Sequence, residues 1–365
     1  AIPPIEFQGY LPGQSGEPQG GNMKAIVIHA AHDLRLEDCE ARGPGPGQVR
    51  IAIQAGGICG SDLHYYHQGG FGPIRLKEPM ILGHEISGVI TDLGEGVQGL
   101  AKGQLIAVSP SRPCQSCQYC LKGMQNHCEN MAFYGSAMPF PHIQGAFRED
   151  LIALPHQCIP ADGLTAGEAA MAEPLAVCIH AMHHAGDLVG KSVLVSGCGP
   201  IGLLSILAAR RAGASEIVAT DLSDFTLKKA LEIGADHALN LATDAEVLAP
   251  WQAGKGQIDV QFECSGAPQA VVAGIKALRP QGVLVQLGLG GDMTLPMQTM
   301  TAKEIVLKGS FRFHAEFATA VQLMQKRLID VAPLITQTYQ LADAVMAFDT
   351  AGDRTQAVKT QIDFT

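Results

Sequence analysis

Short apolar runs between turn residues characterise the first part of the chain, from residue 24 to about residue 154. Apolar and β-branched residues gather at 25–29, 48–54 and 87–93, and a Gly-Pro-Gly-Pro-Gly run at 43–47 separates two of these segments. Short runs of this kind, bounded by Gly and Pro, are typical of strands. This part of the sequence therefore predicts a β-rich domain.

A regular alternation of helical and strand patterns begins near Glu173. The spacing of apolar residues predicts helices at 173–184, 201–211, 224–233 and 267–278. Continuous apolar runs predict strands at 192–196, 216–220, 258–263 and 283–287. Such an alternation is typical of a doubly wound parallel sheet. From residue 312 onward the pattern predicts one long helix and a closing strand at 360–363. The predicted fold class is an α/β domain joined to a β-rich domain.

Length and charge narrow the classes of protein. The chain of 365 residues predicts two domains, because natural domains usually span about 100–200 residues. Lys and Arg total 25 against 35 Asp and Glu, which gives a net charge of -10, and aromatic residues make up 5%. A nucleic-acid-binding surface is normally basic, so we expect no nucleic-acid partner. No uncharged apolar stretch reaches the roughly 18 residues of a membrane span, so we expect no membrane partner.

The first 22 residues are rich in Gly, Pro and Gln and contain no Lys or Arg. A secretory signal needs a basic start and an apolar run, and neither is present. We expect residues 1–22 to be a leader or processed tail outside the fold, with Met23 as the natural start. Without an export signal, the chain is expected in the reducing cytoplasm. Clustered cysteines there bind metal more often than they form disulfides.

Four of the ten cysteines lie within fifteen residues, in the pattern C-x2-C-x2-C-x7-C: Cys114, Cys117, Cys120 and Cys128. A structural zinc site needs four ligands at tetrahedral corners, and short spacers bring four thiolates together within one loop. The alternative is an iron–sulfur cluster, but the bacterial ferredoxin run C-x3-C-P does not follow Cys120. The spacing therefore predicts a structural zinc ion that stabilises a lobe and takes no part in chemistry.

Scattered ligands of mixed type predict a second metal site. Cys59 lies in Gly-Ile-Cys-Gly-Ser-Asp, His84 and Glu85 lie in Gly-His-Glu, and Glu173 begins Glu-Pro-Leu. A thiolate, an imidazole and a carboxylate fit a catalytic zinc, which keeps one position open for water or substrate. Each residue taken alone is most simply structural, so the prediction depends on their combination. The pair at 183–184, two adjacent histidines, is expected at the surface rather than at a metal.

A glycine motif directly follows the strand predicted at 192–196 and opens the next helix: Gly197, Cys198, Gly199, Pro200, Ile201 and Gly202. The first glycine allows a tight turn, the second lets a phosphate approach the backbone, and the third allows close packing of helix on strand. The N-terminus of the helix then faces the pyrophosphate of a dinucleotide with its partial positive charge.

Asp221 lies 19 residues past Gly202, at the end of the next predicted strand, where a ribose-binding acid is expected. An acid at this position repels a 2′-phosphate. No arginine follows directly, because the next residues are Leu222 and Ser223. The sequence therefore predicts NAD as the cofactor in preference to NADP.

These motifs together resemble those of the zinc-dependent medium-chain dehydrogenases, in the polyol branch that includes sorbitol dehydrogenase. The resemblance covers residue 23 to the C-terminus. The segments that carry it are Gly-Gly-Ile-Cys-Gly-Ser-Asp-Leu-His-Tyr-Tyr at 56–66, Phe-Tyr-Gly-Ser-Ala-Met at 133–138, Phe-Pro-His at 140–142 and Gly-Ser-Phe-Arg-Phe at 309–313. The resemblance implies a GroES-like catalytic domain at 23–173 and 312–365, interrupted by a Rossmann domain at 174–311. It also implies a homodimer or homotetramer.

The resemblance further implies hydride transfer between a nicotinamide and a secondary alcohol of a polyol or sugar acid. L-idonate and 5-keto-D-gluconate form the leading substrate pair, and sorbitol or xylitol is the alternative. Cys59, His84 and either Glu85 or Glu173 are implied to hold the catalytic zinc. Many members of the family have a cysteine where this chain has Glu173, so the third ligand stays open. A non-enzymatic NAD-binding protein is the alternative from another class, and the complete ligand set argues against it.

Four further residues are assigned roles only through the resemblance. Ser61 and His64 are implied to carry the proton outward from the reacting hydroxyl. Tyr65 and Arg312 are candidates for binding substrate hydroxyls or a carboxylate. The fork of donors on Arg312 suits an acid sugar, and a contact with the cofactor or with another subunit is the alternative.

Overall fold

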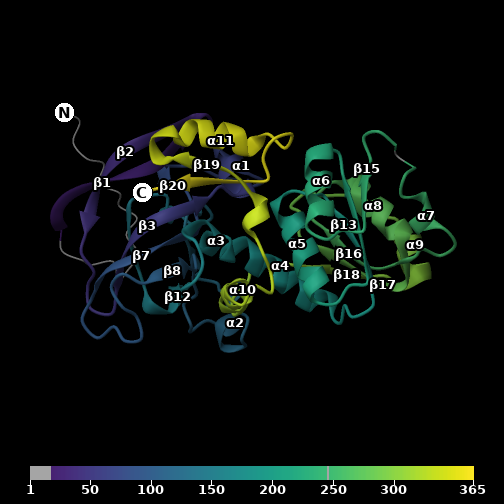
Figure 1. The fold of residues 1–365 in the computed structure, drawn as a ribbon, viewed down its shortest axis with the longest axis horizontal. Helices are drawn as coiled ribbons and strands as arrows, with labels where there is room; N and C mark the ends of the chain where they lie inside the picture. Colours follow the sequence, from purple (N-terminus) through teal and green to yellow (C-terminus); the bar gives the residue numbers. More distant parts are fainter. Residues whose placement is uncertain (1–17, 245) are drawn as a thin grey trace.

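The structure is a computed structural model that describes residues 18–244 and 246–365. A β-rich lobe, which contains the first and last described strands, lies beside a lobe built on a parallel sheet (Figure 1). Two helices lie where the lobes meet, α4 (Ala172–Ala185) and α10 (Glu316–Gln325), and they pack against each other. Among residues 18–244 and 246–365, no helix is long and apolar enough to cross a membrane.

The β-rich lobe is assembled from both ends of the chain. Its strands are β1 (Pro18–Ala30), β2 (Asp33–Arg42), β3 (Val49–Gly57), β4 (Gly70–Phe71), β5 (Ile74–Arg75), β6 (Met80–Ile81), β7 (Glu85–Leu93), β8 (Leu105–Val108), β9 (Ser111–Arg112), β10 (Ala132–Phe133), β11 (Asp150–Ala153), β12 (Cys158–Pro160), β19 (Ile335–Gln340) and β20 (Lys359–Asp363). The main sheet has the order β12-β8-β7-β3-β20-β19, and β11 also pairs with β3. The C-terminal strand β20 therefore lies against β3, far from it in sequence.

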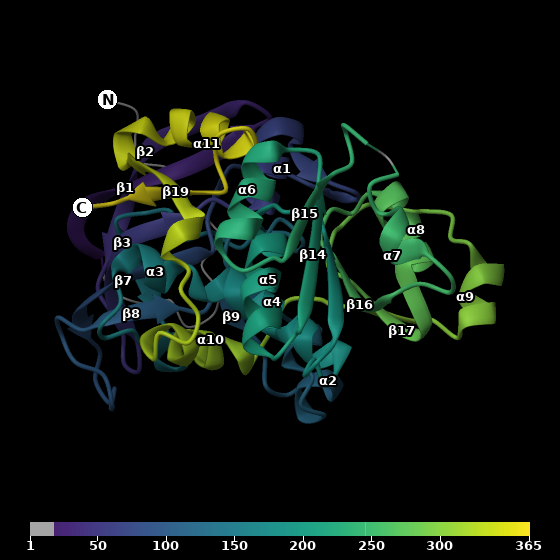
Figure 2. The same cartoon turned by 45° about the vertical axis from the view of Figure 1, so that its right-hand side comes forward.

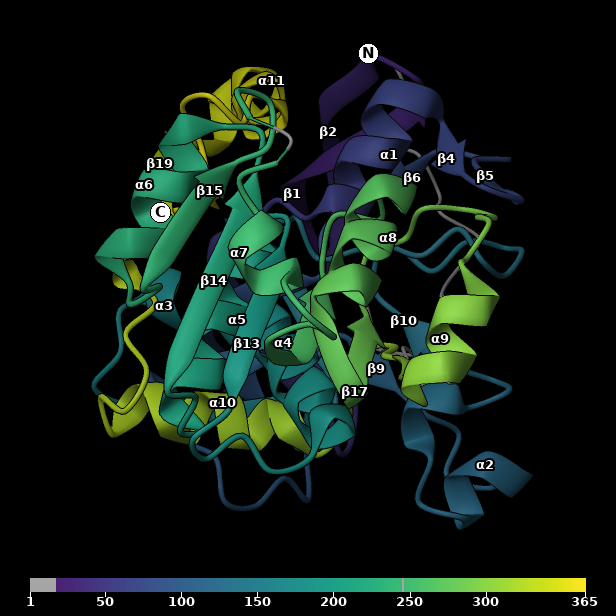
Figure 3. The ribbon, with the colours of Figure 1, turned by 90° about the vertical axis from the view of Figure 1, so that its right-hand side faces the viewer.

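The second lobe has the strands β13 (Ser192–Ser196), β14 (Glu216–Asp221), β15 (His237–Asn240), β16 (Ile258–Glu263), β17 (Leu278–Gln286) and β18 (Val306–Gly309). They form one parallel sheet in the order β15-β14-β13-β16-β17-β18. Figure 3 shows β15, β14 and β13 side by side in it. This is the strand order of the dinucleotide-binding Rossmann fold, in which ligands bind at the carboxyl ends of the strands where the order reverses. That point lies between β13 and β16.

The remaining helices are α1 (Gly60–Gln68), α2 (Gln118–Leu121), α3 (Ala166–Ala170), α5 (Pro200–Arg211), α6 (Asp224–Glu232), α7 (Ala249–Gln252), α8 (Pro268–Ala277), α9 (Met297–Lys303) and α11 (Ala344–Gly352). Helices α4, α5 and α6 cover one face of the parallel sheet, and α8 and α9 cover the other (Figure 2). Val193 and Val195 of β13 point into the first core and Leu194 into the second. Burial on both faces explains the continuous apolar run of this strand.

The structure confirms the predicted alternation of helices and strands between 173 and 287, and it corrects two other expectations. Residues 18–22, expected outside the fold, form the start of β1, where Pro18 pairs with Arg42 and Asn22 with Glu40. Backbone pairing with β2 places these residues in the sheet. Residues 1–17 of the predicted leader lie outside the described residues.

The prediction of one long helix after residue 312 is wrong. Helix α10 ends at Gln325, the strand β19 follows, and α11 begins only at Ala344. Arg327 has a positive φ of 52° and Pro333 lies in the next turn, and both features end a helix. The sequence patterns also missed other strands, among them β2, β8, β11, β12, β15, β18 and β19. The predicted domain limits, 23–173 with 312–365 and 174–311, stay a prediction.

Candidate active site and metal centres

A thiol, an imidazole and a carboxylate meet at the end of β3. Cys59 is the N-cap of α1, directly after β3, and Glu85 begins β7. The two strands pair with Gly57 opposite Glu85, so their register brings Cys59 close to His84 and Glu85. One ligand atom from each of these three residues lies within 4.8 Å of the other two. The structure thus brings together three of the four predicted ligands in one compact group.

The chemistry of this group fits a zinc ion. Nδ1 of His84 is buried without a hydrogen-bond partner in the described structure, and it lies 3.7 Å from Oδ1 of Asp62. Burial raises the pKa of the Cys59 thiol to about 12, and the negative charge of Glu85 adds to this effect. A cation would satisfy the unpaired nitrogen and stabilise the thiolate. A thiolate, an imidazole and a carboxylate are donors that zinc uses in open sites.

Glu173 lies at the edge of this group, in the first turn of α4. Burial raises the pKa of its carboxyl group to about 8, against the opposing effect of His84. The charges of Glu85 and Cys59 raise that pKa further. Glu173 therefore shares the electrostatic environment of the site, although it does not belong to the compact group. Which acid binds the metal stays a prediction.

Lys359 is a residue of this site that the sequence did not reveal. It begins β20 and is buried, and its Nζ donates to Oε1 and Oε2 of Glu85 at 2.8 and 2.7 Å. A third bond goes to the carbonyl oxygen of Ile58 at 3.1 Å. The two charged residues are 274 positions apart, and only the pairing of β20 with β3 brings them together. A lysine directly before the strand predicted at 360–363 was the one available signal.

The predicted proton-relay residues share helix α1. Ser61 and His64 are both half-buried, and burial lowers the pKa of the His64 ring. The ring of His64 lies 5.7 Å from that of Phe71. The two residues are three positions apart on one helix, which places them on the same side. Their role in proton transfer stays a prediction.

The two candidate substrate residues lie close enough to interact electrostatically. The Tyr65 hydroxyl is buried and accepts a hydrogen bond of 3.0 Å from the backbone N–H of Ala137. The Arg312 guanidinium lies over the rings of Phe133 and Phe311, at 4.3 and 4.9 Å from their centroids. Burial lowers its pKa, and the nearby charges of Glu173 and Tyr65 oppose that change.

Arg312 is a cation without a carboxylate partner among residues 18–244 and 246–365. Its one polar side-chain contact there is weak, from Nη2 to the Met138 sulfur at 3.5 Å. Aromatic faces hold the guanidinium in place and leave most of its donors free. A fork of free donors close to Glu173 can bind a carboxylate bidentately.

The glycine motif forms a tight turn between β13 and α5, as predicted, and its role in binding phosphate stays a prediction. Gly197 has a positive φ of 87°, and α5 begins at Pro200, directly after Gly199. A Cβ on Gly202 would overlap the carbonyl oxygen of Gly197, so only glycine fits this approach of helix to strand. The structure places the motif, with Ile201 in the first turn of α5, at the carboxyl end of β13. This is where a dinucleotide binds in the fold.

Asp221 ends β14 beside this turn. Its carboxylate accepts hydrogen bonds from the backbone N–H of Cys198 at 2.5 Å, Leu222 at 2.7 Å and Ser223 at 3.0 Å. These bonds fix an anionic side chain next to the phosphate turn. The structure therefore places Asp221 where the sequence predicts the ribose-binding acid.

Arg354 is a second residue that the sequence did not reveal. It lies between α11 and β20, and its guanidinium covers Gly199 so closely that a Cβ there would overlap it. Its carbonyl oxygen accepts a hydrogen bond of 2.9 Å from the Ser223 hydroxyl. A residue of the β-rich lobe thus contacts the phosphate turn of the other lobe. Nothing in the local sequence around residue 354 indicates this.

The four clustered cysteines form the second metal centre, around α2 in the loop after β9. Their sulfur atoms all lie within 4.8 Å of one another. Backbone N–H groups lower the pKa of Cys114 to about 5 and also lower that of Cys117. Burial raises the pKa of Cys120 to about 12 and also raises that of Cys128. Four sulfur ligands at this spacing fit a closed zinc site.

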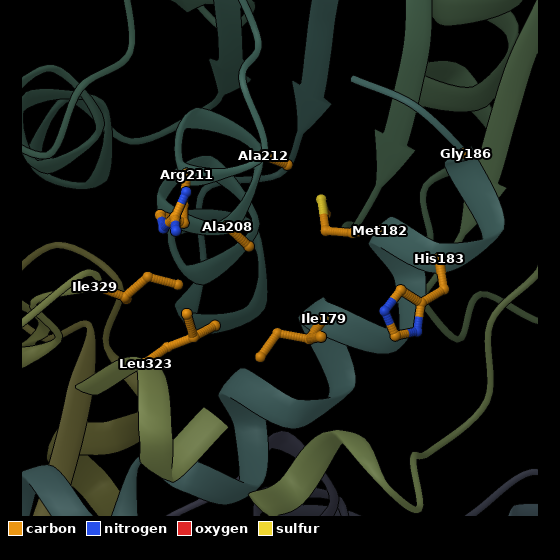
Figure 4. Close-up of a pocket in the computed structure, with 9 residues that line it drawn as sticks. All are labelled: Ile179, Met182, His183, Gly186, Ala208, Arg211, Ala212, Leu323 and Ile329. Carbon is orange, nitrogen blue, oxygen red and sulfur yellow. The ribbon is translucent and has the colours of Figure 1, made fainter. Parts of the chain in front are cut away.

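A surface groove of about 410 Å³ lies away from both centres, between α4, α5 and α10 (Figure 4). Its lining is mainly apolar, with His183 and Arg211 as the basic side chains. None of the predicted site residues lines it. We therefore assign the chemistry to the metal centre and the phosphate turn rather than to this groove.

Comparison with known proteins agrees with a zinc centre and a dinucleotide-binding site. A family model described as the alcohol dehydrogenase GroES-like domain matches residues 45–163, and one described as zinc-binding dehydrogenase matches residues 200–326. L-idonate 5-dehydrogenase (NAD(P)(+)) of Escherichia coli (strain K12) is 45% identical over 318 residues, which cover 86% of this chain and 91% of the relative. Sorbitol dehydrogenase of Bos taurus is 36% identical over 334 residues, covering 90% and 92%.

Solved structures show the same fold. The crystal structure of Escherichia coli L-idonate 5-dehydrogenase matches with a TM-score of 0.90 and 41% identity, covering 94% of this chain and 99% of that one. The chain therefore belongs to the zinc-dependent medium-chain dehydrogenases, and it is an NAD(P)-dependent zinc enzyme of their polyol branch. Within that branch it is similar to L-idonate 5-dehydrogenase and to the sorbitol dehydrogenases.

Replacing Cys117 with serine should remove one zinc ion per chain and lower the midpoint of thermal unfolding, because a structural zinc site contributes directly to folding free energy. Zinc content by mass spectrometry and a thermal melt provide the measurements. Cys39→Ala, a buried cysteine outside the cluster, is the control and should keep the full zinc content. A Cys117→Ser protein with unchanged zinc content would contradict the assignment.

Replacing Lys359 with methionine should destabilise the fold by about 3–5 kcal/mol, because it leaves the Glu85 carboxylate buried and unpaired. Denaturant unfolding is measured for Lys359→Met, for Glu85→Gln and for the double variant that carries both substitutions. The double variant should recover part of the lost stability, because it no longer buries a lone charge. A Lys359→Met protein as stable as the wild type would show that the ion pair is dispensable.

Proposed function

We propose that the protein oxidises L-idonate to 5-keto-D-gluconate, with reduction of NAD, and catalyses the reverse reaction. The observation that carries this proposal is Arg312, a cation fixed beside the metal centre with its donors free of any carboxylate in the described chain. A sugar acid supplies the missing carboxylate, whereas a neutral polyol does not. The similarity to Escherichia coli L-idonate 5-dehydrogenase supports the same substrate.

Cys59, His84 and Glu85 would hold the catalytic zinc, since their donor atoms form the compact group. When bound, zinc supplies Lewis acidity that favours the ionised form of a hydroxyl ligand and polarises a ketone. Lys359 fixes Glu85 by donating two hydrogen bonds to its carboxylate. Glu173, which interacts electrostatically with this group, would accept a hydrogen bond from the reacting hydroxyl. Ser61 and His64 would then carry the proton toward solvent.

NAD is the proposed cofactor in preference to NADP. Asp221 presents a carboxylate at the end of β14, and the two residues after it are uncharged. A carboxylate can accept hydrogen bonds from ribose hydroxyls and repels a 2′-phosphate. The Arg354 guanidinium lies over Gly199 instead, at the position of the pyrophosphate in this fold. We therefore assign Arg354 to the pyrophosphate.

A neutral polyol is the second candidate substrate, because sorbitol dehydrogenases are also similar to this chain over most of its length. We further propose a cytoplasmic homodimer or homotetramer. The edge strand β18 supports association, since Val306 and Leu307 are both exposed on it. The free state of all ten cysteines agrees with a reducing compartment.

Initial rates with L-idonate, sorbitol, xylitol and simple alcohols, each with NAD and with NADP, test the proposed function. The highest kcat/KM is expected with L-idonate and NAD. Activity confined to neutral polyols would support the second candidate and contradict the role given to Arg312. The absence of any dehydrogenase activity in the zinc-loaded protein would overturn both.

Replacing Arg312 with leucine should lower kcat/KM for L-idonate by about 10–100-fold, because hydrogen bonds between charged groups contribute about 1.5–3 kcal/mol. The rate with sorbitol should change much less, since sorbitol has no carboxylate. Arg312→Lys keeps the charge and serves as the matched control, with an intermediate loss expected. An equal loss on both substrates would indicate a structural role for Arg312.

Replacing Arg354 with glutamine should raise the Kd of NAD by about tenfold, because it removes a charged donor from the pyrophosphate. Fluorescence titration measures binding without turnover. Adenosine, which has no phosphate, should bind both proteins equally, and Arg211→Gln at the distant groove is the control. A loss of adenosine binding that equals the loss of NAD binding would show that the pocket itself has changed.

A further inference from the structure

Three histidines and one glutamate cluster at the C-terminal end of α4, on the opposite end of that helix from Glu173. His180, His183 and His184 lie in the last turns of α4, and Glu316 lies in the first turn of α10. Neither metal centre uses these residues. The sequence predicted only that the pair at 183–184 lies at the surface, and it did not connect that pair with His180.

Two of the imidazoles face each other at the spacing of metal ligands. His180 and His184 are one helical turn apart, and their Nε2 atoms are 3.2 Å apart. Two nitrogen ligands of a tetrahedral zinc ion, each at about 2.0–2.1 Å from it, lie about 3.3–3.4 Å apart. Histidines at i and i+4 on one helix face are a known way to chelate zinc. The two nitrogens lie close to that spacing, and without an ion they are also within hydrogen-bond distance of each other.

Glu316 fixes which nitrogen of His180 is available. Nδ1 of His180 lies 2.9 Å from Oε1 of Glu316, and Nδ1 of His183 lies 3.1 Å from the same oxygen. An ionised carboxylate can only accept, so Nδ1 of His180 carries the proton, and in the neutral ring Nε2 has a lone pair that can accept from Nε2–H of His184 or bind a metal. A carboxylate behind a histidine in this way orients the ring and increases its basicity as a ligand.

The surrounding charges are close to balanced. Lys308 of β18 donates from Nζ to the carbonyl oxygen of His184 at 2.8 Å, and its positive charge opposes a second cation. The carboxylate of Glu316 offsets that charge. The negative end of the α4 dipole also favours a cation at this position. His180 and His184 are partly accessible to solvent, so an ion can reach them.

From this geometry we propose a third metal site, in which Nε2 of His180 and Nε2 of His184 bind a divalent first-row transition-metal ion and Glu316 orients His180. Water molecules would complete the coordination. Imidazole is a donor for zinc, nickel and copper, whereas magnesium and calcium prefer oxygen. The site is independent of the proposed dehydrogenase function, because no residue of the zinc or dinucleotide sites belongs to it.

Equilibrium dialysis of the full chain against micromolar Zn²⁺ at pH 7.5, after both zinc centres have been filled, tests the proposal. The wild type should bind one ion more than the His184→Ala and His180→Ala variants. Glu316→Gln should bind the same ion about 10–100-fold more weakly, since it keeps both ligands and loses only the orienting charge. His237→Ala, an exposed histidine on β15, is the control and should bind as the wild type does.

A wild type that takes up no additional ion overturns the proposal, and so does an additional ion that persists in His184→Ala. Anomalous diffraction at the zinc edge, from zinc-soaked crystals of the unmodified protein, gives a second test that needs no variant. A peak between the two Nε2 atoms supports the site. Peaks at the two zinc centres with none between the Nε2 atoms on α4 contradict it. Neither zinc dialysis nor anomalous diffraction depends on dehydrogenase activity. An inactive protein would therefore overturn the proposed function without changing the result for the third metal site.

Discussion

A buried ion pair joins the last strand of the chain to the catalytic centre. Lys359 begins β20 and Glu85 begins β7, and both strands pair with β3. An unpaired charge at this depth would cost several kcal/mol, so each member of the pair depends on the other. The position of Glu85 beside Cys59 and His84 therefore depends on the chain returning to the β-rich lobe after it has built the parallel sheet.

The same return brings two arginines to the region between the lobes. Arg312 lies beside Glu173, and Arg354 lies over Gly199. The dinucleotide lobe supplies backbone N–H groups and a helix N-terminus, while the later part of the chain supplies positive side chains. A cofactor bound at the turn would contact both lobes. Its binding therefore favours the arrangement in which Arg354 approaches the turn, because a ligand stabilises the state that it contacts better.

The features that could be predicted from the sequence are those whose signals are local. Four cysteines within fifteen residues, a glycine turn between a strand and a helix, and regular apolar spacing each depend on neighbours in the chain. Lys359 and Arg354 could not be predicted, because their partners are set by sheet topology. The long helix expected after residue 312 is interrupted near Arg327, which has a positive φ. The spacing of apolar residues carries no information about that backbone angle.

The charge balance of the catalytic centre explains why sequence reasoning left its third ligand open. Cys59, Glu85 and Glu173, when ionised together, place three negative charges near the ammonium of Lys359 and the guanidinium of Arg312. A divalent cation would offset the negative charge that remains, whichever of the two acids binds it. Burial disfavours the charged forms of Cys59 and Glu173, and a metal reverses that preference. Lys359 already shares the charge of Glu85, which leaves Glu173 as the carboxylate most dependent on the metal.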